Sequence, residues 1–284
     1  MASLNPSSDI SSYINTIFEG AILVARDNNV MTGLVRTFND RTGVAVRDNS
    51  QYGGATMNQI AETDDLVGQA FTPSSIATLT PTEFGAQYTL TDLRRESDPF
   101  SVQQDASTDL GLAMATKVET ELMKHFNAFT SGTIGGAGSA CTWSYLLAME
   151  AILKNAKAPY PYFMVMSPYQ WYPLGKAASV ATTATNAPQS LLEQVNSMFF
   201  VKQAGGVFIF TSTNLETSST DAFAGMFSRD ALGLDMRRQP RLEPERDASA
   251  RSYELNMTAV FATGVWRPTF GVCGYFANSA PTGV

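Results

Sequence analysis

The side chains best suited to nucleophilic chemistry in this sequence are its one histidine and its two cysteines. His125 lies beside Phe126 in a stretch with helical periodicity, and Cys141 and Cys273 lie far apart in the chain. A Ser/His/Asp or Cys/His arrangement needs a nucleophile, a histidine and a third group that orients it. No such context surrounds His125 or Cys141, so catalysis is not predicted. We expect His125 on a helix surface, where it packs or pairs with a neighbouring side chain.

Two other segments have compositions that occur in ligand sites, one acidic and one rich in glycine. Glu62, Asp64 and Asp65 form an acidic cluster, but it lacks the alternating ligands and the glycine of a calcium-binding loop. Residues 132–138 are rich in glycine but lack the lysine of a phosphate-binding loop, so we expect a flexible connector. The cysteines have no CxxC spacing, which indicates neither zinc nor a disulfide framework and fits a reducing cytoplasm. The sequence predicts no cofactor and no metal.

Charges of both signs are interleaved over a short segment near the C-terminus. These residues are Arg237, Arg238, Arg241, Glu243, Glu245, Arg246, Asp247 and Arg251. A nucleic-acid patch would not need the acidic members, whereas mixed signs suit matching protein edges because they fix register and penalise wrong partners. Local ion pairing on the surface of one subunit is the alternative. Arg94 and Arg95, which precede Glu96, allow the same two interpretations.

Composition limits the possible partners. The chain has 284 residues, 44% of them hydrophobic, which is enough to bury a sizeable core. Its net charge of −7 disfavours strong binding to DNA, because no basic field is available to displace counterions. The polar, serine-rich N-terminus does not resemble a secretory signal, and no apolar run is long enough to span a membrane.

The N-terminal region is predicted to be an arm, residues 1–55. Apolar residues between 10 and 22 recur at spacings of three and four, which indicates a short amphipathic helix led by Ile14, Ile17 and Phe18. Its apolar stripe has no evident partner within an arm, so we expect these three side chains to contact a neighbouring subunit. Residues 30–54 alternate loosely and are expected to be extended.

A long hairpin is predicted over residues 56–96. Its two strands would be 66–72 and 84–93, and the connection between them is too long for a tight turn. A lone two-stranded ribbon is marginal in water, so the hairpin should be mobile in the free chain. Arg94 and Arg95 at its base would pair with Glu243 or Glu245 of a neighbour.

A long helix is predicted over residues 99–129. Asp98 and Pro99 supply an N-cap and a first helical residue, and an apolar line follows at spacings of three and four. At about 1.5 Å per residue the rod would be roughly 45 Å long, which suits a strut.

A mixed α/β region and further strands follow the strut. Helices are predicted at 143–156 and 189–198, and buried strands at 162–166 and 207–211. The C-terminal part is expected to form three more strands. These are residues 234–244, 251–261 and 266–276.

This order of elements resembles that of the major capsid proteins of tailed bacteriophages, which have the Hong Kong 97 fold. The resemblance covers nearly the whole chain and rests on FGAQYTLTDLRRESDPF and STDLGLAMATKVETELM, within residues 84–123, and on FSRDALGLDMRRQPRLEPERDASARSYELNMTAVFATGVWRP, residues 227–268. These segments are similar to the family's extended loop, spine helix and peripheral strands. The resemblance implies an α+β fold with an arm, an extended loop, a peripheral domain (97–140 and 222–284) and an axial domain (141–221).

The resemblance also implies a function and partners. The chain would form hexamers and pentamers of an icosahedral head that encloses double-stranded DNA, assembled in the host cytoplasm. Its partners would be a portal, a separate scaffolding protein and a cement protein, with weak non-specific contact to DNA and none to membranes. The alternatives are an encapsulin-like container of the same fold and a soluble α/β hydrolase. Particle imaging separates the first from a phage head, and small oligomers would indicate the second.

Overall fold

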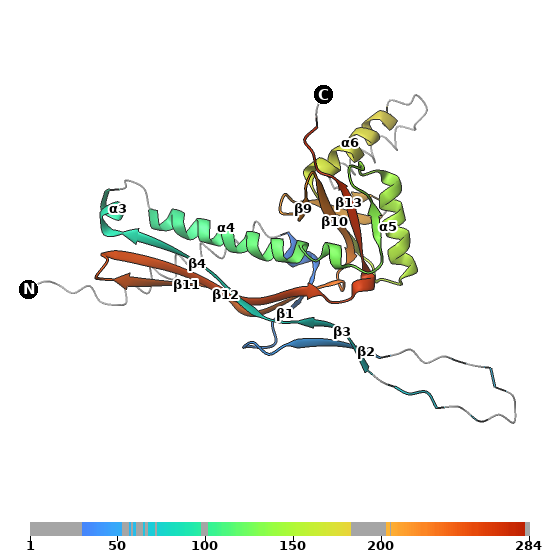
Figure 1. Cartoon of the computed structure of the whole chain (residues 1–284), viewed down its shortest axis with the longest axis horizontal. Coiled ribbons are helices and arrows are strands. Elements are labelled where there is room, and N and C mark those ends of the chain that lie inside the picture. Colours follow the sequence, from blue (N-terminus) through green and yellow to red (C-terminus); the bar gives the residue numbers. More distant parts are fainter. Residues whose placement is uncertain are drawn as a thin grey trace, which may run out of the picture.

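The computed structural model describes residues 30–52, 57, 59–60, 65, 68–71, 73–97, 102–182, 203–204 and 206–281. Within these residues the chain is a mixture of helices and sheets, as the predicted α+β class requires (Figure 1). The strands form one four-stranded, one seven-stranded and one two-stranded sheet.

The four-stranded sheet is long and narrow. Its order is β1-β11-β12-β4, and β1 is the parallel member. Its strands are β1 (Arg36–Phe38), β4 (Thr82–Thr91), β11 (Leu232–Asp247) and β12 (Ser252–Val265). The predicted strands 234–244 and 251–261 are confirmed, and both are longer than expected.

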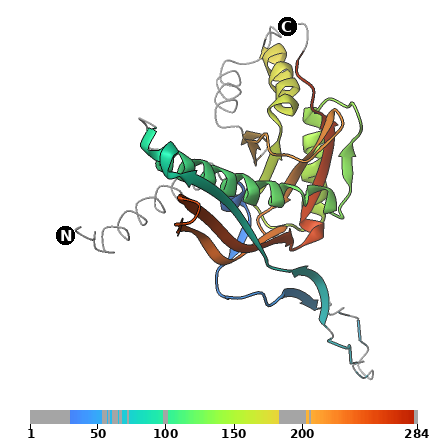
Figure 2. The same ribbon diagram turned by 60° about the vertical axis from the view of Figure 1, so that its left-hand side comes forward.

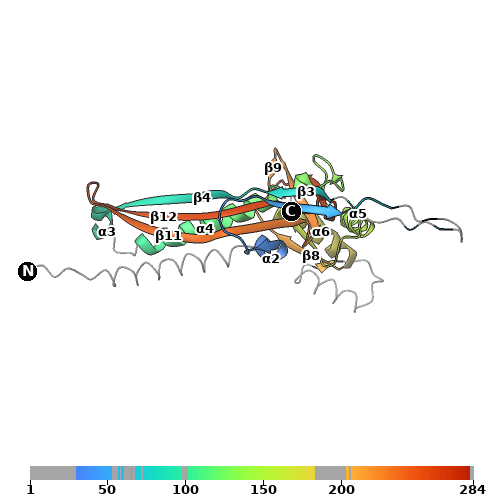
Figure 3. The same cartoon turned by 90° about the horizontal axis from the view of Figure 1, so that it is seen from below.

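Helix α4 (Val102–Met123) lies along this sheet, as Figures 1 and 3 show. Alternate residues of β12 from Leu255 to Phe261 are buried in the same core as the helix. The apolar line of the helix is buried there with them. Its members are Leu110, Met114, Val118 and Leu122. The predicted stripe therefore positions the helix on the sheet.

The helix is shorter than the predicted range 99–129. The α-helix ends at Met123, and a short 3-10 helix, η1 (Phe126–Ala128), follows after a turn. The turn lets Phe126 point into the core, where it is fully buried. The predicted start at Asp98 and Pro99 lies outside the described residues, and the preceding short helix is α3 (Asp92–Ser97).

The seven-stranded sheet has the order β5-β13-β10-β6-β8-β7, with β9 beside β10. Its strands are β5 (Thr133–Gly135), β6 (Tyr162–Met166), β7 (Gln203–Ala204), β8 (Val207–Thr211), β9 (Thr217–Ser218), β10 (Asp221–Ser228) and β13 (Gly271–Ala277). Helices α5 (Trp143–Asn155) and α6 (Pro168–Thr182) pack beside it (Figure 1). The predictions for 143–156, 162–166 and 207–211 are confirmed. The predicted helix 189–198 lies outside the described residues.

The predicted hairpin is wrong in its strands. The run 84–93 is largely β4, which pairs with β12 along the long sheet, and the described residues of the other predicted strand, 68–71, form no strand. The projecting hairpin consists of β2 (Arg47–Tyr52) and β3 (Pro73–Leu79), so its first strand lies within the range assigned to the arm. Figure 2 shows this hairpin leaving the body away from both sheets. The chain reaches β4 directly from β3, through two residues, and enters a different sheet there.

Sheet membership also bears on the predicted domains. The prediction grouped residues 222–284 with the strut helix, yet β10 and β13 pair with each other and β10 pairs with β6. The last predicted strand begins only at Gly271, because the 3-10 helix η2 (Pro268–Phe270) separates it from β12. The domain boundaries themselves stay a prediction.

Aromatic rings join the strut to the seven-stranded sheet. Phe126 lies over Gly225 of β10, where an added Cβ would be 2.6 Å from the ring. Phe129 lies over Gly271 of β13, where the same distance would be 2.4 Å. Glycine is needed at both strand positions because a larger residue would collide with these rings.

Candidate assembly surfaces

The base of the hairpin is tied to the long sheet by buried charges. Asp235 of β11 is fully buried, and one of its oxygens accepts a hydrogen bond from Arg47 at 2.8 Å and forms an ion pair with Arg237 at 2.8 Å. Arg47 also pairs with the exposed Asp40. Burial alone would lower the pKa of Arg47, but its hydrogen bonds to Asp235 and Asp40 raise it on balance. The guanidinium of Arg47 lowers the pKa of Asp40.

The far end of the long sheet carries a second charged cluster. Arg246 makes a bidentate pair with Asp92 at 2.6 and 2.7 Å, and this hydrogen bonding lowers the pKa of Asp92. The guanidinium groups of Arg246 and Arg95 both lie over the ring of Tyr253, at 4.6 and 4.8 Å from its centroid. Arg95 therefore has a contact within its own subunit. The side chain of Arg94 is not among the side chains that the structure describes.

The residues predicted to contact neighbours occupy different environments. Glu243 is exposed and pairs with Arg241 at 2.6 Å, and Glu245 is exposed directly opposite Glu254 on β12. Arg238 pairs with Glu83 near the surface. These local ion pairs agree with the alternative interpretation of the mixed charges.

The position of Arg237 differs from the prediction. Its side chain is only 1% exposed, because β11 turns it into the cluster around Asp235, so it is an internal residue of the subunit. The other predicted contacts, Ile14, Ile17 and Phe18, lie outside the described residues. Contact of any of the predicted residues with a neighbour stays a prediction.

The groups considered for catalysis lie in structural positions. His125 lies in the turn after α4, not on the helix, and its Nε2 is 3.1 Å from the hydroxyl of Thr263. Burial lowers the pKa of His125. Burial raises the pKa of the Cys141 thiol to about 12 and that of Cys273 to about 11, so both thiols are protonated near neutrality. Thiols held in this form are weak nucleophiles.

A buried carboxyl that the sequence prediction missed lies on the strut. Glu119 accepts a hydrogen bond from the hydroxyl of Ser212 at 2.8 Å, at the end of β8. Burial raises the pKa of Glu119, although hydrogen bonds from Ser212 and Asn214 oppose the shift. The position of Glu119 off the predicted apolar line gave no signal of this burial.

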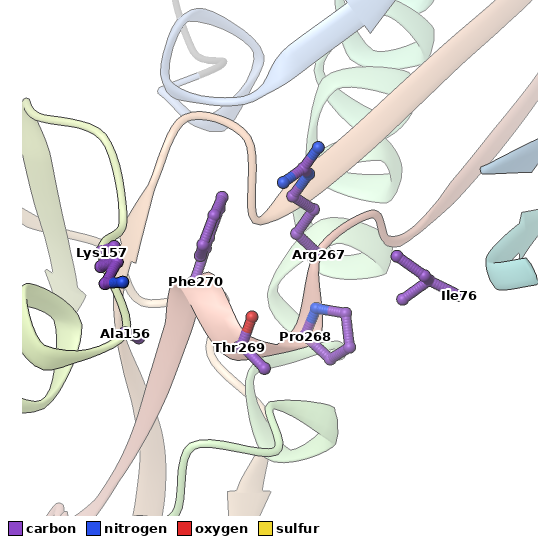
Figure 4. A pocket seen from close by; sticks show the side chains of 7 residues that line it. All are labelled: Ile76, Ala156, Lys157, Arg267, Pro268, Thr269 and Phe270. Atoms are coloured by element: carbon purple, nitrogen blue, oxygen red, sulfur yellow. The ribbon is translucent and has the colours of Figure 1, made fainter. Parts of the chain in front are cut away.

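The described part of the chain was predicted to hold no metal or cofactor. No group of three or more His, Cys, Asp or Glu side chains there could hold a metal ion. None of the helices in this part is long and apolar enough to cross a membrane. A pocket of about 260 Å³ lies between β3, the turn after α5, and η2 (Figure 4). Lys157 and Arg267 line it from opposite sides, and Arg267 lies over the ring of Phe270.

Large apolar side chains are exposed on several elements. Those in the described part of the hairpin connection are Met57, Ile60 and Phe71, at 94%, 50% and 74% exposure. Leu147 of α5 and Tyr169 of α6 are also exposed. Such side chains outside a core are candidates for contact with other chains.

A long sheet braced by a strut helix, a second sheet at one end and a projecting hairpin define a subunit of a protein shell with the Hong Kong 97 fold. A family model described as "Phage capsid protein" matches residues 75–273. The chain belongs to this family, and it is a major capsid protein of an icosahedral phage capsid. Self-association into capsomers follows from this membership.

Solved structures agree on the fold. The chain is similar to one from Mycobacterium phage Che8, with a TM-score of 0.68, 17% identity, and coverage of 87% of this chain and 90% of that one. It is similar to the capsid of Ralstonia phage GP4, with a TM-score of 0.64, 12% identity, and coverage of 88% and 89%. It is also similar to a virus-like particle from Pyrococcus furiosus, with a TM-score of 0.62, 9% identity, and coverage of 92% of this chain and 98% of that one. No curated protein matches the chain.

Proposed function

We propose that this major capsid protein forms hexamers and pentamers of a head that encloses the double-stranded DNA of a tailed phage, and that assembly takes place in the host cytoplasm. A portal, a separate scaffolding protein and a cement protein are its proposed partners. The protein acts without catalysis or a cofactor. Net charge of −7 limits its contact with DNA to weak, non-specific binding.

The observation that carries this proposal is the projecting hairpin. The two strands β2 and β3 pair only over residues 47–52 and 73–79, and the described apolar side chains beyond them are exposed. A two-stranded ribbon of this kind is marginal in water. Burial of these apolar side chains against a neighbouring subunit would stabilise the hairpin. The N-terminal residues Ile14, Ile17 and Phe18 are proposed to bind a neighbour for the same reason.

Particle formation tests the proposal directly. The purified protein, expressed with and without a candidate scaffolding protein, is followed by sedimentation velocity and electron microscopy. Closed shells of uniform diameter are expected, and deletion of residues 1–20 should abolish or misdirect them. A protein that stops at a small oligomer under all these conditions would contradict the proposal.

The two arginines of α3, Arg94 and Arg95, are proposed to pair with Glu243 or Glu245 of a neighbour. Replacing Arg94 and Arg95 together by Glu should reduce shell yield and leave the melting temperature of the free subunit nearly unchanged. Because Arg95 also lies over Tyr253, Tyr253→Leu is the matched control, since it removes that stacking and keeps both charges. Normal shells from the charge-reversed variant would exclude this contact.

The container of the same fold was the alternative from the sequence, and the match to the phage capsid family does not favour it, although a virus-like particle shares the architecture over most of both chains. Imaging of particles from infected cells discriminates between them. A portal, a tail and packed DNA indicate a phage head, and shells filled with protein indicate a container.

A further inference from the structure

The charges at the hairpin base join two segments that are far apart in the sequence. Arg47 brings the first hairpin strand to Asp235, and Arg237 reaches the same carboxylate oxygen from two residues along β11. Arg237 also donates a hydrogen bond to the carbonyl of Ala45 at 2.8 Å, just before the hairpin begins. The side chains of Arg47, Asp235 and Arg237 are only 10%, 0% and 1% exposed. We name these three residues the base cluster.

An apolar contact holds the second strand at the same level. Leu79 is the register partner of Arg47 and is fully buried beside Ala262 and Trp266. Gly233 and Gly264 make room for it, because a Cβ at these positions would lie 3.2 and 2.6 Å from its methyl groups. Both strands of the hairpin are thus fixed to β11 and β12 at their inner ends.

The ribbon changes immediately beyond this point. Asn49 still donates a hydrogen bond to the carbonyl of Trp266 at 2.7 Å. The register of β2 and β3 then shifts between Asn49 and Ser50. A bulge bends a ribbon and increases its twist, so the hairpin is anchored up to Asn49 and can bend beyond it.

The base cluster is poorly suited to stabilising the fold. Burying charges costs desolvation free energy that is regained only when the hydrogen bonding is complete. Within the described part of the chain, Oδ1 of Asp235 and both Nε and Nη1 of Arg237 have no hydrogen-bond partner. Well-packed apolar residues of similar size are often at least as stable at such sites. The cluster is therefore better explained by a role other than stability.

We propose that the base cluster is a positioning device that sets the direction in which the hairpin leaves the subunit. This inference rests on the proposed role of the hairpin in contacts between subunits. An extended chain of ten residues reaches at most about 33 Å, so a rotation of roughly 10° at the base moves its end by as much as about 6 Å. Displacement of that size would take the hairpin out of register with its partner surface.

The test uses Arg47→Met, with Arg41→Met as the matched control. Arg41 is a nearby exposed arginine that reaches Asp40 only at 3.9 Å. Hydrogen exchange on the unassembled subunit should show faster exchange in residues 73–79 of the Arg47 variant and unchanged exchange in β11 and β12. Electron microscopy should show particles of mixed diameter or open sheets from this variant, and uniform shells from the Arg41 variant.

A second variant separates positioning from stability. The triple replacement Arg47→Met, Asp235→Leu and Arg237→Met removes the charges together and leaves none unpaired among them. It should fold with an unfolding midpoint at or above that of the original chain and still give irregular particles. Uniform shells from either variant, or faster exchange spread through β11 and β12, would overturn the proposed positioning role. Absence of shells from the original chain would instead refute the proposed function, while the exchange of residues 73–79 would still decide whether the cluster anchors the hairpin.

Discussion

Replacing Phe126 by Ala should strongly destabilise the subunit, because this ring connects the strut to the seven-stranded sheet. Phe126 is fully buried, and its ring centroid lies 5.6 Å from that of Phe227 and 6.1 Å from that of Phe129. The strand beneath it has Gly225, so no side chain from that position could fill the space left by the ring. The cavity left by the Phe126→Ala change should therefore persist. The loss of stability should lie in the upper part of the range that is usual for Phe→Ala changes.

A Phe→Ala change in a well-packed core costs about 3–5 kcal/mol. We expect about 4 kcal/mol for Phe126→Ala from urea unfolding of the unassembled subunit, with an unchanged dependence on denaturant. Leu147→Ala is the control, because this side chain is 61% exposed on α5 and its loss should change stability by no more than about 0.5 kcal/mol. A cost below about 1.5 kcal/mol for Phe126→Ala would mean that the strut and the sheet do not depend on this contact, contrary to the reasoning.

Other predictions concern buried titratable groups and the hairpin. The raised pKa of Glu119 favours the folded state in acid, and this contribution is lost as pH rises through the folded-state pKa. Glu119→Gln should therefore raise the unfolding midpoint near neutrality. Equal unfolding midpoints for the variant and the original chain would contradict this prediction. The lowered pKa of His125 has the opposite effect on the free energy of unfolding, which falls as pH drops below about 6.5 because the unfolded state then binds the proton more readily. His125→Gln should reduce that fall and leave particle yield near normal. Cys141 and Cys273 should react with a thiol reagent slowly in the folded subunit and rapidly in urea, and fast reaction of both in the folded state would oppose their burial. Residues 82–91 should be protected from hydrogen exchange before assembly, because β4 is paired with β12; rapid exchange there would restore the original hairpin prediction.

Local patterns predicted most of the helices and strands correctly. The apolar spacing that indicated the strut is the spacing that packs on β12, and residues 254–259 alternate between half-buried polar and buried apolar side chains, although Ser252 before them is buried. Pairing between strands was harder to predict, because it depends on contacts distant in sequence. The run 84–93 has the composition of a strand, but nothing in it distinguishes β12, more than 150 residues later, from a partner just upstream.

The strut shows a similar limit at its end. Its apolar line continues through Phe126 and Phe129, so periodicity alone extends the helix to residue 129. Helical continuation after Met123 would conflict with the position of these rings over Gly225 and Gly271. Tertiary packing ends the helix early and keeps both rings in the core.

The assembly surface was less predictable than the fold, and the pair Arg237 and Arg238 shows why. These adjacent arginines look equivalent in a mixed-charge run, yet one is buried with Asp235 and the other pairs with Glu83 near the surface. The one available signal was Asp235 itself, an acidic residue within the apolar run LGLDM of a strand. A buried carboxylate needs a cationic partner, and that partner could have been sought among the arginines two residues away and in the hairpin.

The function could be predicted without these details because a shell subunit performs it through its shape. An enzyme would require a few side chains in fixed relation, and loss of their signal would hide the activity. Here the long sheet, the strut and the projecting hairpin are each encoded by many residues. The order of these elements can therefore be predicted from the sequence, although single contacts cannot. The same reasoning explains why the base cluster matters in spite of its small size. It is placed where a few side chains control the direction of a whole element, and a change there should alter particles more than it alters the stability of the subunit.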